Sequence, residues 1–255
     1  MEITREVTRR QSKLKQMISK QEIGKRIAEI DWSKIESDLN QWGFAKTASI
    51  LSVEECRGLI EQYDQPSVFR SRVVMERHQF GSGEYQYFAD PLPEVVSRLR
   101  EELYPPLSRI SQRWAAELGS GEQFPNDLEG LLALCRKHGQ VRPTPLLLRY
   151  DAGGYNCLHQ DLYGEIAFPL QAVSVLSQPG CDYTGGEFLL VEQRPRMQSR
   201  GEAISLQRGE LLFFPNRYRP VRGTRGSYRV QVRHGLSRLH SGRRFSLGII
   251  FHNAK

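Results

Sequence analysis

Three side chains in the C-terminal half of the chain have the types and spacing to bind one metal ion. His159 and Asp161 flank a single residue, and His234 follows much farther along the chain. Alternate side chains of an extended segment point the same way, so His159 and Asp161 would face a common point. Two imidazoles and one carboxylate on one face of an octahedron leave positions open for dioxygen and a second ligand. The pattern therefore predicts an iron(II) centre.

A candidate carboxylate-binding site lies on the apolar segment that follows His234. If this segment is a strand, Arg244 and Ser246 share one of its faces, while Phe245 and Leu247 share the other. A buried arginine needs an anion, and charge-assisted hydrogen bonds to a carboxylate contribute about 1.5–3 kcal/mol each. We therefore expect Arg244 to hold a carboxylate, with the Ser246 hydroxyl as a second donor. Arg243 should point the other way.

The elements that must position these side chains begin at about residue 145. From there, short apolar runs alternate with Gly, Pro and Asn, which is typical of strands. Six or more short strands with irregular loops predict an α+β protein whose core, about 145–252, is a double-stranded β-helix, or jelly roll. Helices from the N-terminal part should pack on one face of this core.

The N-terminal half is predicted to be mainly helical. Apolar residues recur at helical spacing within 1–40, at Leu14, Met17, Ile18, Ile23, Ile27 and Ile30. A capping box formed by Ser52 and Glu55 predicts a helix through Gln62. A longer helix is expected over 92–118, bent at Pro105 and Pro106. We divide the chain into a helical extension, 1–45, and a catalytic domain, 46–255.

Composition bounds the class of protein. No apolar run is long enough for a membrane span and the first residues are charged, so we expect a cytoplasmic protein with no membrane partner. The four cysteines form no CxxC pair, which argues against a structural zinc site. The net charge of +7 would attract a polyanion such as nucleic acid, although a basic solvated surface explains it equally well.

Taken together, these residues resemble the iron(II)/2-oxoglutarate-dependent dioxygenase superfamily. Its pattern is His-x-Asp, a distant His, and an Arg followed two positions later by a small hydroxyl residue, as in His159, Asp161, His234, Arg244 and Ser246. The resemblance covers roughly 146–251. It implies an oxidoreductase that uses iron(II), 2-oxoglutarate and dioxygen, with ascorbate as an aid in vitro. It also implies that Tyr150, or alternatively Tyr155, contacts the 2-oxoglutarate held by Arg244.

Within the superfamily, the chain is similar to a group of bacterial oxygenases linked to oxidative demethylation of alkylated nucleic acid, a form of DNA repair. His159-Gln160-Asp161 and the upstream Arg149-Tyr150 resemble the AlkB-type demethylases. Those enzymes have a longer Arg-x-Asn-x-Thr-x-Arg run after the distal histidine. The single Arg244-Phe245-Ser246 instead looks like the prolyl hydroxylase type.

Several alternatives stay open. A hydroxylase of a peptide, protein or amino acid is the alternative to a nucleic-acid demethylase, and a non-catalytic jelly-roll binding module or a zinc hydrolase is the alternative to an oxygenase. His240 is a less favoured distal ligand than His234. Nucleic acid is favoured by three basic segments: the N-terminal helices, whose basic residues crowd into the first 26 positions, 69–88, which mixes aromatic and basic residues, and 217–225, which is rich in arginine. His78, His138 and His252 are predicted to be structural or on the surface.

Overall fold

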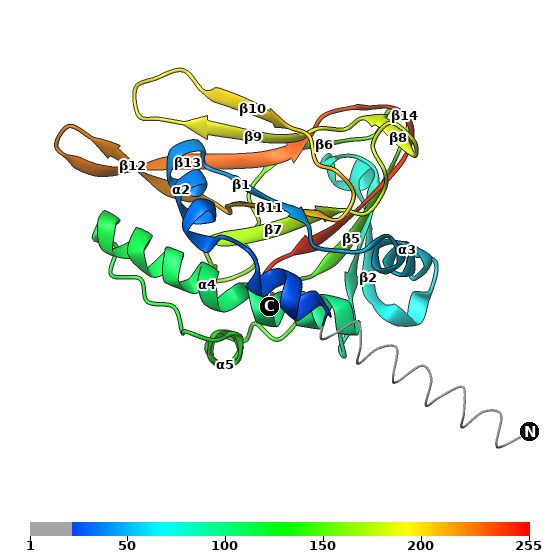
Figure 1. Ribbon diagram of the computed structural model, residues 1–255, viewed down its shortest axis with the longest axis horizontal. Helices are drawn as coiled ribbons and strands as arrows, with labels where there is room; N and C mark the ends of the chain where they lie inside the picture. The colour runs from blue at the N-terminus through cyan, green and yellow to red at the C-terminus, as the bar shows by residue number, and fades with distance from the viewer. Residues whose placement is uncertain (1–21) are drawn as a thin grey trace, which may run out of the picture.

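The fold is two antiparallel sheets stacked face to face with helices on one side, as Figure 1 shows. It is described by a computed structural model for residues 22–255. The apolar positions Leu14, Met17 and Ile18 lie outside the described residues. The predicted α+β jelly roll with helices packed on one face is confirmed.

The larger sheet carries the helices on its outer face. Its strands lie in the order β1-β11-β7-β14-β5-β4-β2, and β8 pairs with part of β14. Their bounds are β1 Ala45–Ser49, β2 Phe69–Val74, β4 Glu84–Phe88, β5 Leu146–Asp151, β7 Leu170–Val175, β8 Tyr183–Gly185, β11 Glu210–Pro215 and β14 Leu239–Ile249.

The smaller sheet forms the other layer. Its order is β10-β9-β13-β6-β3, and β12 pairs with β13 in a hairpin that projects from the body. Their bounds are β3 Gly81–Ser82, β6 Tyr155–His159, β9 Phe188–Gln193, β10 Arg200–Ile204, β12 Tyr218–Gly223 and β13 Gly226–Leu236.

The helices agree in part with those predicted from the sequence. Residues 22–28 are helical, followed by α2 Trp32–Trp42, α3 Val53–Glu61, α4 Glu94–Leu118, α5 Leu128–Lys137 and two short 3-10 helices, η1 Pro66–Val68 and η2 Met75–His78. The capping box is confirmed, because the Ser52 hydroxyl accepts from the Glu55 amide and the Glu55 carboxylate accepts from the Ser52 amide. No described helix combines the length and apolar character that crossing a membrane requires.

Helices predominate in the described part of the N-terminal half, as predicted, but this half also contains strands that the prediction missed. Four strands, β1 to β4, lie before residue 89, and three of them complete the larger sheet. Each pairs with a strand distant in sequence or with another of the four, which local patterns do not reveal. The division at residues 45 and 46 stays a prediction.

Alternation along the strands separates two apolar cores. On β11, Leu211 and Phe213 belong to the core that the helices cover, where Phe213 packs on Trp32 of α2, whereas Leu212 and Phe214 belong to the core between the sheets. The buried Arg100 of α4 fixes the helix to the chain just beyond β14, because its guanidinium donates to the carbonyls of residues 250 and 251. The larger sheet is therefore held in place from outside, and its inner face is free to line a cavity.

Gly209 offers a test of how the edge strand β1 is docked. Its φ is +80°, and an added Cβ would lie 2.2 Å from the Leu51 carbonyl oxygen. Gly139 has a similar φ of +73°, with no atom within 4 Å of an added Cβ. We expect Gly139→Ala to cost about 1 kcal/mol from backbone strain alone and Gly209→Ala about 3 kcal/mol, because it adds a clash. Urea unfolding measures both. Equal losses would contradict the close approach at Gly209.

Candidate metal centre and its cavity

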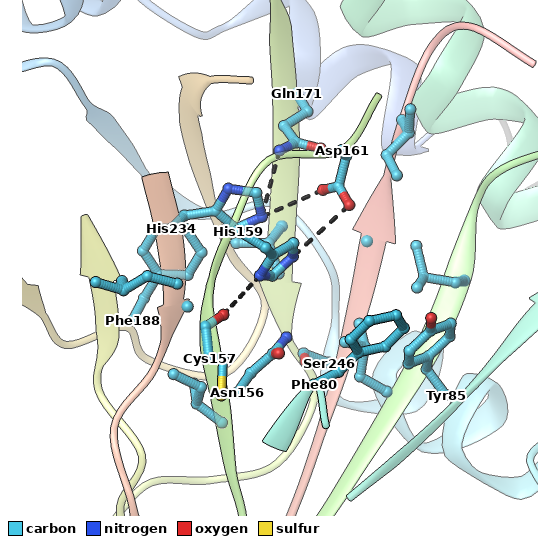
Figure 2. A pocket seen from close by; sticks show the side chains of 18 of the residues that line it. Phe80, Tyr85, Asn156, Cys157, His159, Asp161, Gln171, Phe188, His234 and Ser246 are labelled. Atoms are coloured by element: carbon cyan, nitrogen blue, oxygen red, sulfur yellow. Dashed lines mark hydrogen bonds and ion pairs between the residues drawn. The ribbon is translucent and has the colours of Figure 1, made fainter. Parts of the chain in front are cut away.

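Strand pairing brings the two predicted histidine ligands together. In the register of β6 and β13, His159 lies directly opposite His234, and their ring centroids are 4.3 Å apart. Asp161 follows the end of β6 and turns back toward both rings, as Figure 2 shows. One Asp161 carboxylate oxygen is 3.6 Å from Nε2 of His159, and the other is 3.2 Å from Nε2 of His234.

These three side chains fit a single divalent metal ion. Their candidate ligand atoms all lie within 4.8 Å of one another. Ligand atoms at about 2.1 Å from a metal and at right angles to each other would be about 3 Å apart. The site therefore needs only small side-chain adjustments to close on an ion, and the donor set of two imidazoles and a carboxylate suits iron(II).

The surroundings of His234 and Asp161 favour the protonation states that a metal requires. Burial lowers the pKa of His234, as does the nearby charge of His159, against the opposing effect of Asp161. Burial alone would raise the pKa of Asp161, but the hydrogen bond to His234 and the charges of both imidazoles hold that pKa well below its usual range. A neutral imidazole and an ionised carboxylate are the metal-binding forms.

Asp161 lies outside any strand, and side chains supply the contacts that a ladder would give. The Asn216 side chain accepts from the Asp161 amide at 2.9 Å and donates to its carbonyl at 2.6 Å. Gln160 donates to the Val232 carbonyl of β13 at 2.8 Å. The Tyr163 hydroxyl donates to the Asp161 carboxylate at 2.7 Å. The loop is thus fixed to the neighbouring strands on both its main chain and its side chain.

The predicted carboxylate site lines the same cavity. The cavity has a volume of about 410 Å³ and reaches from the three ligands to Tyr150, Arg244 and Ser246. Arg244 lies opposite Tyr150 in the register of β14 and β5. Arg243 points to the other side and pairs with Asp151 at 2.6 Å, as expected from the alternation.

Arg244 is buried without an acidic partner. Its side chain is 2% exposed, and it forms no ion pair with any residue in the described range 22–255. One guanidinium nitrogen donates to the Ser246 hydroxyl at 3.0 Å, and Nε has no hydrogen-bond partner. Because a buried unpaired charge is costly, this arrangement fits a bound carboxylate such as that of 2-oxoglutarate.

The other tyrosine and histidines considered from the sequence lie outside the cavity. Tyr155 and His240 are exposed and do not line the cavity. His252 is buried and accepts from the Phe168 amide, so it is structural, while His138 pairs with Glu165 on the surface. His78 is exposed and stacks against the ring of Phe80.

Sequence reasoning missed Asn216, Tyr163 and Gln171. Gln171 is buried on β7, and its side-chain amide nitrogen lies 3.5 Å from Nε2 of His234. The asparagine directly after an apolar strand, in Phe213-Phe214-Pro215-Asn216, was a usable signal, because a buried amide there must find a partner. Nothing local points to Gln171.

A protein-family comparison decides the class. Residues 83–254 match the model of a family described as an oxygenase catalysing oxidative methylation of damaged DNA. The chain belongs to this oxygenase family. The match includes all three candidate ligands together with Tyr150, Arg244 and Ser246. The predicted superfamily and the predicted oxidoreductase are thereby confirmed.

Similar proteins agree with this membership. An uncharacterized protein of Mycobacterium tuberculosis is 53% identical over 167 residues, which cover 66% of this chain and 72% of the relative. A solved 2OG-Fe(II) oxygenase-family oxidoreductase of Burkholderia pseudomallei has a TM-score of 0.50 at 14% identity, over 89% of this chain and 94% of that one. A Trichoplax adhaerens prolyl hydroxylase solved with a peptide fragment has a TM-score of 0.52 at 14% identity, over 87% and 89%. The chain therefore shares the fold of these two solved structures.

Asn216→Ala tests whether the loop contacts matter for metal binding. The change leaves the Asp161 amide and carbonyl without their side-chain partner, so the carboxylate is no longer preset. We expect about tenfold weaker iron(II) binding, measured by anaerobic titration. Asn126→Ala is the control, since this exposed amide contacts only the surface side chain of Gln112. Equal affinities in both folded variants would contradict the positioning role.

Proposed function

We propose that the protein is an iron(II)- and 2-oxoglutarate-dependent dioxygenase that oxidatively demethylates alkylated nucleic acid. The observation that carries the proposal is one cavity with a His-Asp-His cluster at one part of its wall and a buried, acid-free arginine at another. A metal alone explains only the first feature. A metal together with a dicarboxylate explains both.

In this proposal His159, Asp161 and His234 hold iron(II). The cosubstrate lies across the cavity, with its distal carboxylate on Arg244 and Ser246. Tyr150 lies beside this carboxylate, and burial raises the pKa of its phenol, so it stays a hydrogen-bond donor. The distal carboxylate thus fixes which end of the cosubstrate faces the metal ligands.

The remaining walls of the cavity favour chemistry that must be kept from bulk water. Val173, Phe188 and Phe214 line it with apolar surface, while Gln171 directs an amide toward the ligand cluster. When bound, iron(II) and 2-oxoglutarate supply the activation of dioxygen and the oxidation of a C–H bond. An N-methyl group oxidised there leaves as formaldehyde, whereas an oxidised ring carbon keeps its hydroxyl group.

Nucleic acid is the proposed substrate for two reasons. The family is described as acting on damaged DNA, and the chain carries a net charge of +7. In addition, Phe80 is 48% exposed at the mouth of the cavity, next to Leu158, which is 41% exposed. Exposed aromatic and apolar side chains at that place can stack on an unpaired base. A methylated base must leave the stack to reach the cavity, so a single strand is the expected form.

Arg244→Ala tests the cosubstrate site, with Arg243→Ala as a matched neighbour. Removing the Arg244 guanidinium takes away the only cation that lines the cavity among the described residues. We expect at least about tenfold weaker binding of 2-oxoglutarate, given about 1.5–3 kcal/mol per charge-assisted hydrogen bond. Arg243→Ala should leave the affinity unchanged, because that side chain pairs with Asp151 on the surface. Anaerobic titration of the visible band of the iron complex measures both, and equal behaviour of the two variants would refute the assignment.

Formaldehyde release from methylated single-stranded DNA tests the substrate. With iron(II), ascorbate and 2-oxoglutarate, the wild-type protein should release formaldehyde and form succinate in equal amounts, and His234→Ala should form neither. A peptide containing proline serves as the comparison. Hydroxylation of that peptide with no formaldehyde from DNA would replace the demethylase by a hydroxylase. No succinate with either substrate would favour a binding module.

A further inference from the structure

The charge of the chain is strongly uneven along its length. Glu210 is the last acidic residue, and the residues after it include nine arginines. Three of these arginines have a partner or a place in the site: Arg219 is buried against Glu192, Arg243 pairs with Asp151, and Arg244 lines the cavity. Arg219 lies inside the basic segment 217–225, so the expectation that this whole segment serves nucleic acid is wrong at that position.

The other arginines of this region are exposed. Five of them belong to the β12–β13 hairpin and its approach, and we call them the arginine row: Arg217, Arg222, Arg225, Arg229 and Arg233. None forms an ion pair with a residue of the described part of the chain. Exposed arginines elsewhere are often paired, as Arg113 is with Glu36 and Arg136 with Glu129.

Two acidic residues near the hairpin do not neutralise the row. Glu122 accepts from the Tyr218 hydroxyl, and Glu117 accepts from the Ser227 hydroxyl. Neither lies within ion-pair distance of an arginine of the row. Arg229 instead stacks over the Tyr218 ring at 4.7 Å, which presents its guanidinium edge to solvent.

The hairpin leads directly to the proposed metal centre. Along β13, exposed and buried side chains alternate, so Arg229 and Arg233 point outward while His234, the next residue, points into the cavity. At about 3.3 Å per residue, Arg225 to Arg233 spans about 26 Å. That length exceeds one nucleotide. The row would therefore contact the nucleic-acid backbone on one side of the target base and not the base itself.

From this arrangement we infer that the arginine row binds the phosphate backbone of a single-stranded nucleic acid flanking the base to be oxidised. The inference rests on the proposed function and adds the docking surface to it. Guanidinium forks match phosphate oxygens, and several of them in series suit a repeating anion.

The chemistry of the hairpin argues against a lipid surface. Membrane-binding elements combine basic residues with exposed apolar ones that enter the bilayer. The exposed large apolar side chains of the described residues lie elsewhere: Trp42, Val53, Phe80, Val141, Tyr155, Leu158, Leu162 and Met197. The row thus offers charge without an apolar anchor.

Binding of a short unmodified DNA strand tests the inference without turnover. The test variant combines Arg222→Gln, Arg225→Gln and Arg233→Gln and keeps Arg229, which packs on Tyr218. The control variant removes the same charge from exposed arginines elsewhere that form no ion pair within residues 22–255, through Arg57→Gln, Arg109→Gln and Arg142→Gln. Fluorescence anisotropy over a range of salt concentrations measures the affinity and its salt dependence.

We expect the row variant to bind at least about tenfold more weakly at low salt, with the slope of log affinity against log salt reduced by about two. The control variant should keep the wild-type slope. Equal binding by the two variants would overturn the inference, even if formaldehyde release stands. Row-dependent binding without formaldehyde release would uphold the inference and reject the demethylase. Binding of the row to vesicles containing phosphatidylserine, with no row-dependent DNA binding, would also overturn it.

Discussion

The pairing of β6 with β13 in one particular register is the constraint on which the rest of the site depends. Side chains alternate along strands, so a slip of one residue would turn His234 away from the cavity and bring Arg233 into it. The register is held by main-chain hydrogen bonds on both sides of β13, to β9 and to β6. The juxtaposition of the two histidines is therefore a property of the sheet more than of the histidines themselves.

Three buried arginines show how the structure distinguishes a structural charge from a binding one. Arg100 donates to main-chain carbonyls and to Asn253, and the charge of Arg219 is paired with Glu192, so a protein oxygen meets each of them. Arg244 is as deeply buried but has only the Ser246 hydroxyl as a hydrogen-bond partner, and it faces a cavity. Of these three guanidinium groups, Arg244 alone lines the cavity and has neither a carbonyl nor a carboxylate partner among the described residues, which fits a bound anion.

The sequence predicts the parts of this site that depend on local alternation. His159 with Asp161 and Arg244 with Ser246 are each two residues apart, and a strand brings such pairs to one side. The contacts of Asn216 with Asp161 and of Gln171 with His234 join residues far apart in sequence, and no period or motif encodes them. The same reason explains why β1 to β4 were not predicted. Their pairing partners lie mostly on distant strands, so the sequence around each of them does not indicate a strand.

The mouth of the cavity is attached to the strand that carries His159. The Cys157 amide of β6 donates to the Phe80 carbonyl at 2.8 Å. Gly81 and Gly83 allow this approach, since a Cβ would lie 2.3 Å from the Tyr155 carbonyl oxygen at the first and 2.6 Å from the Tyr150 ring at the second. The exposed ring of Phe80 is therefore placed by backbone contact with the same strand that supplies a proposed metal ligand. Because one strand fixes both, the distance from the mouth to the ligand cluster is set before any substrate arrives.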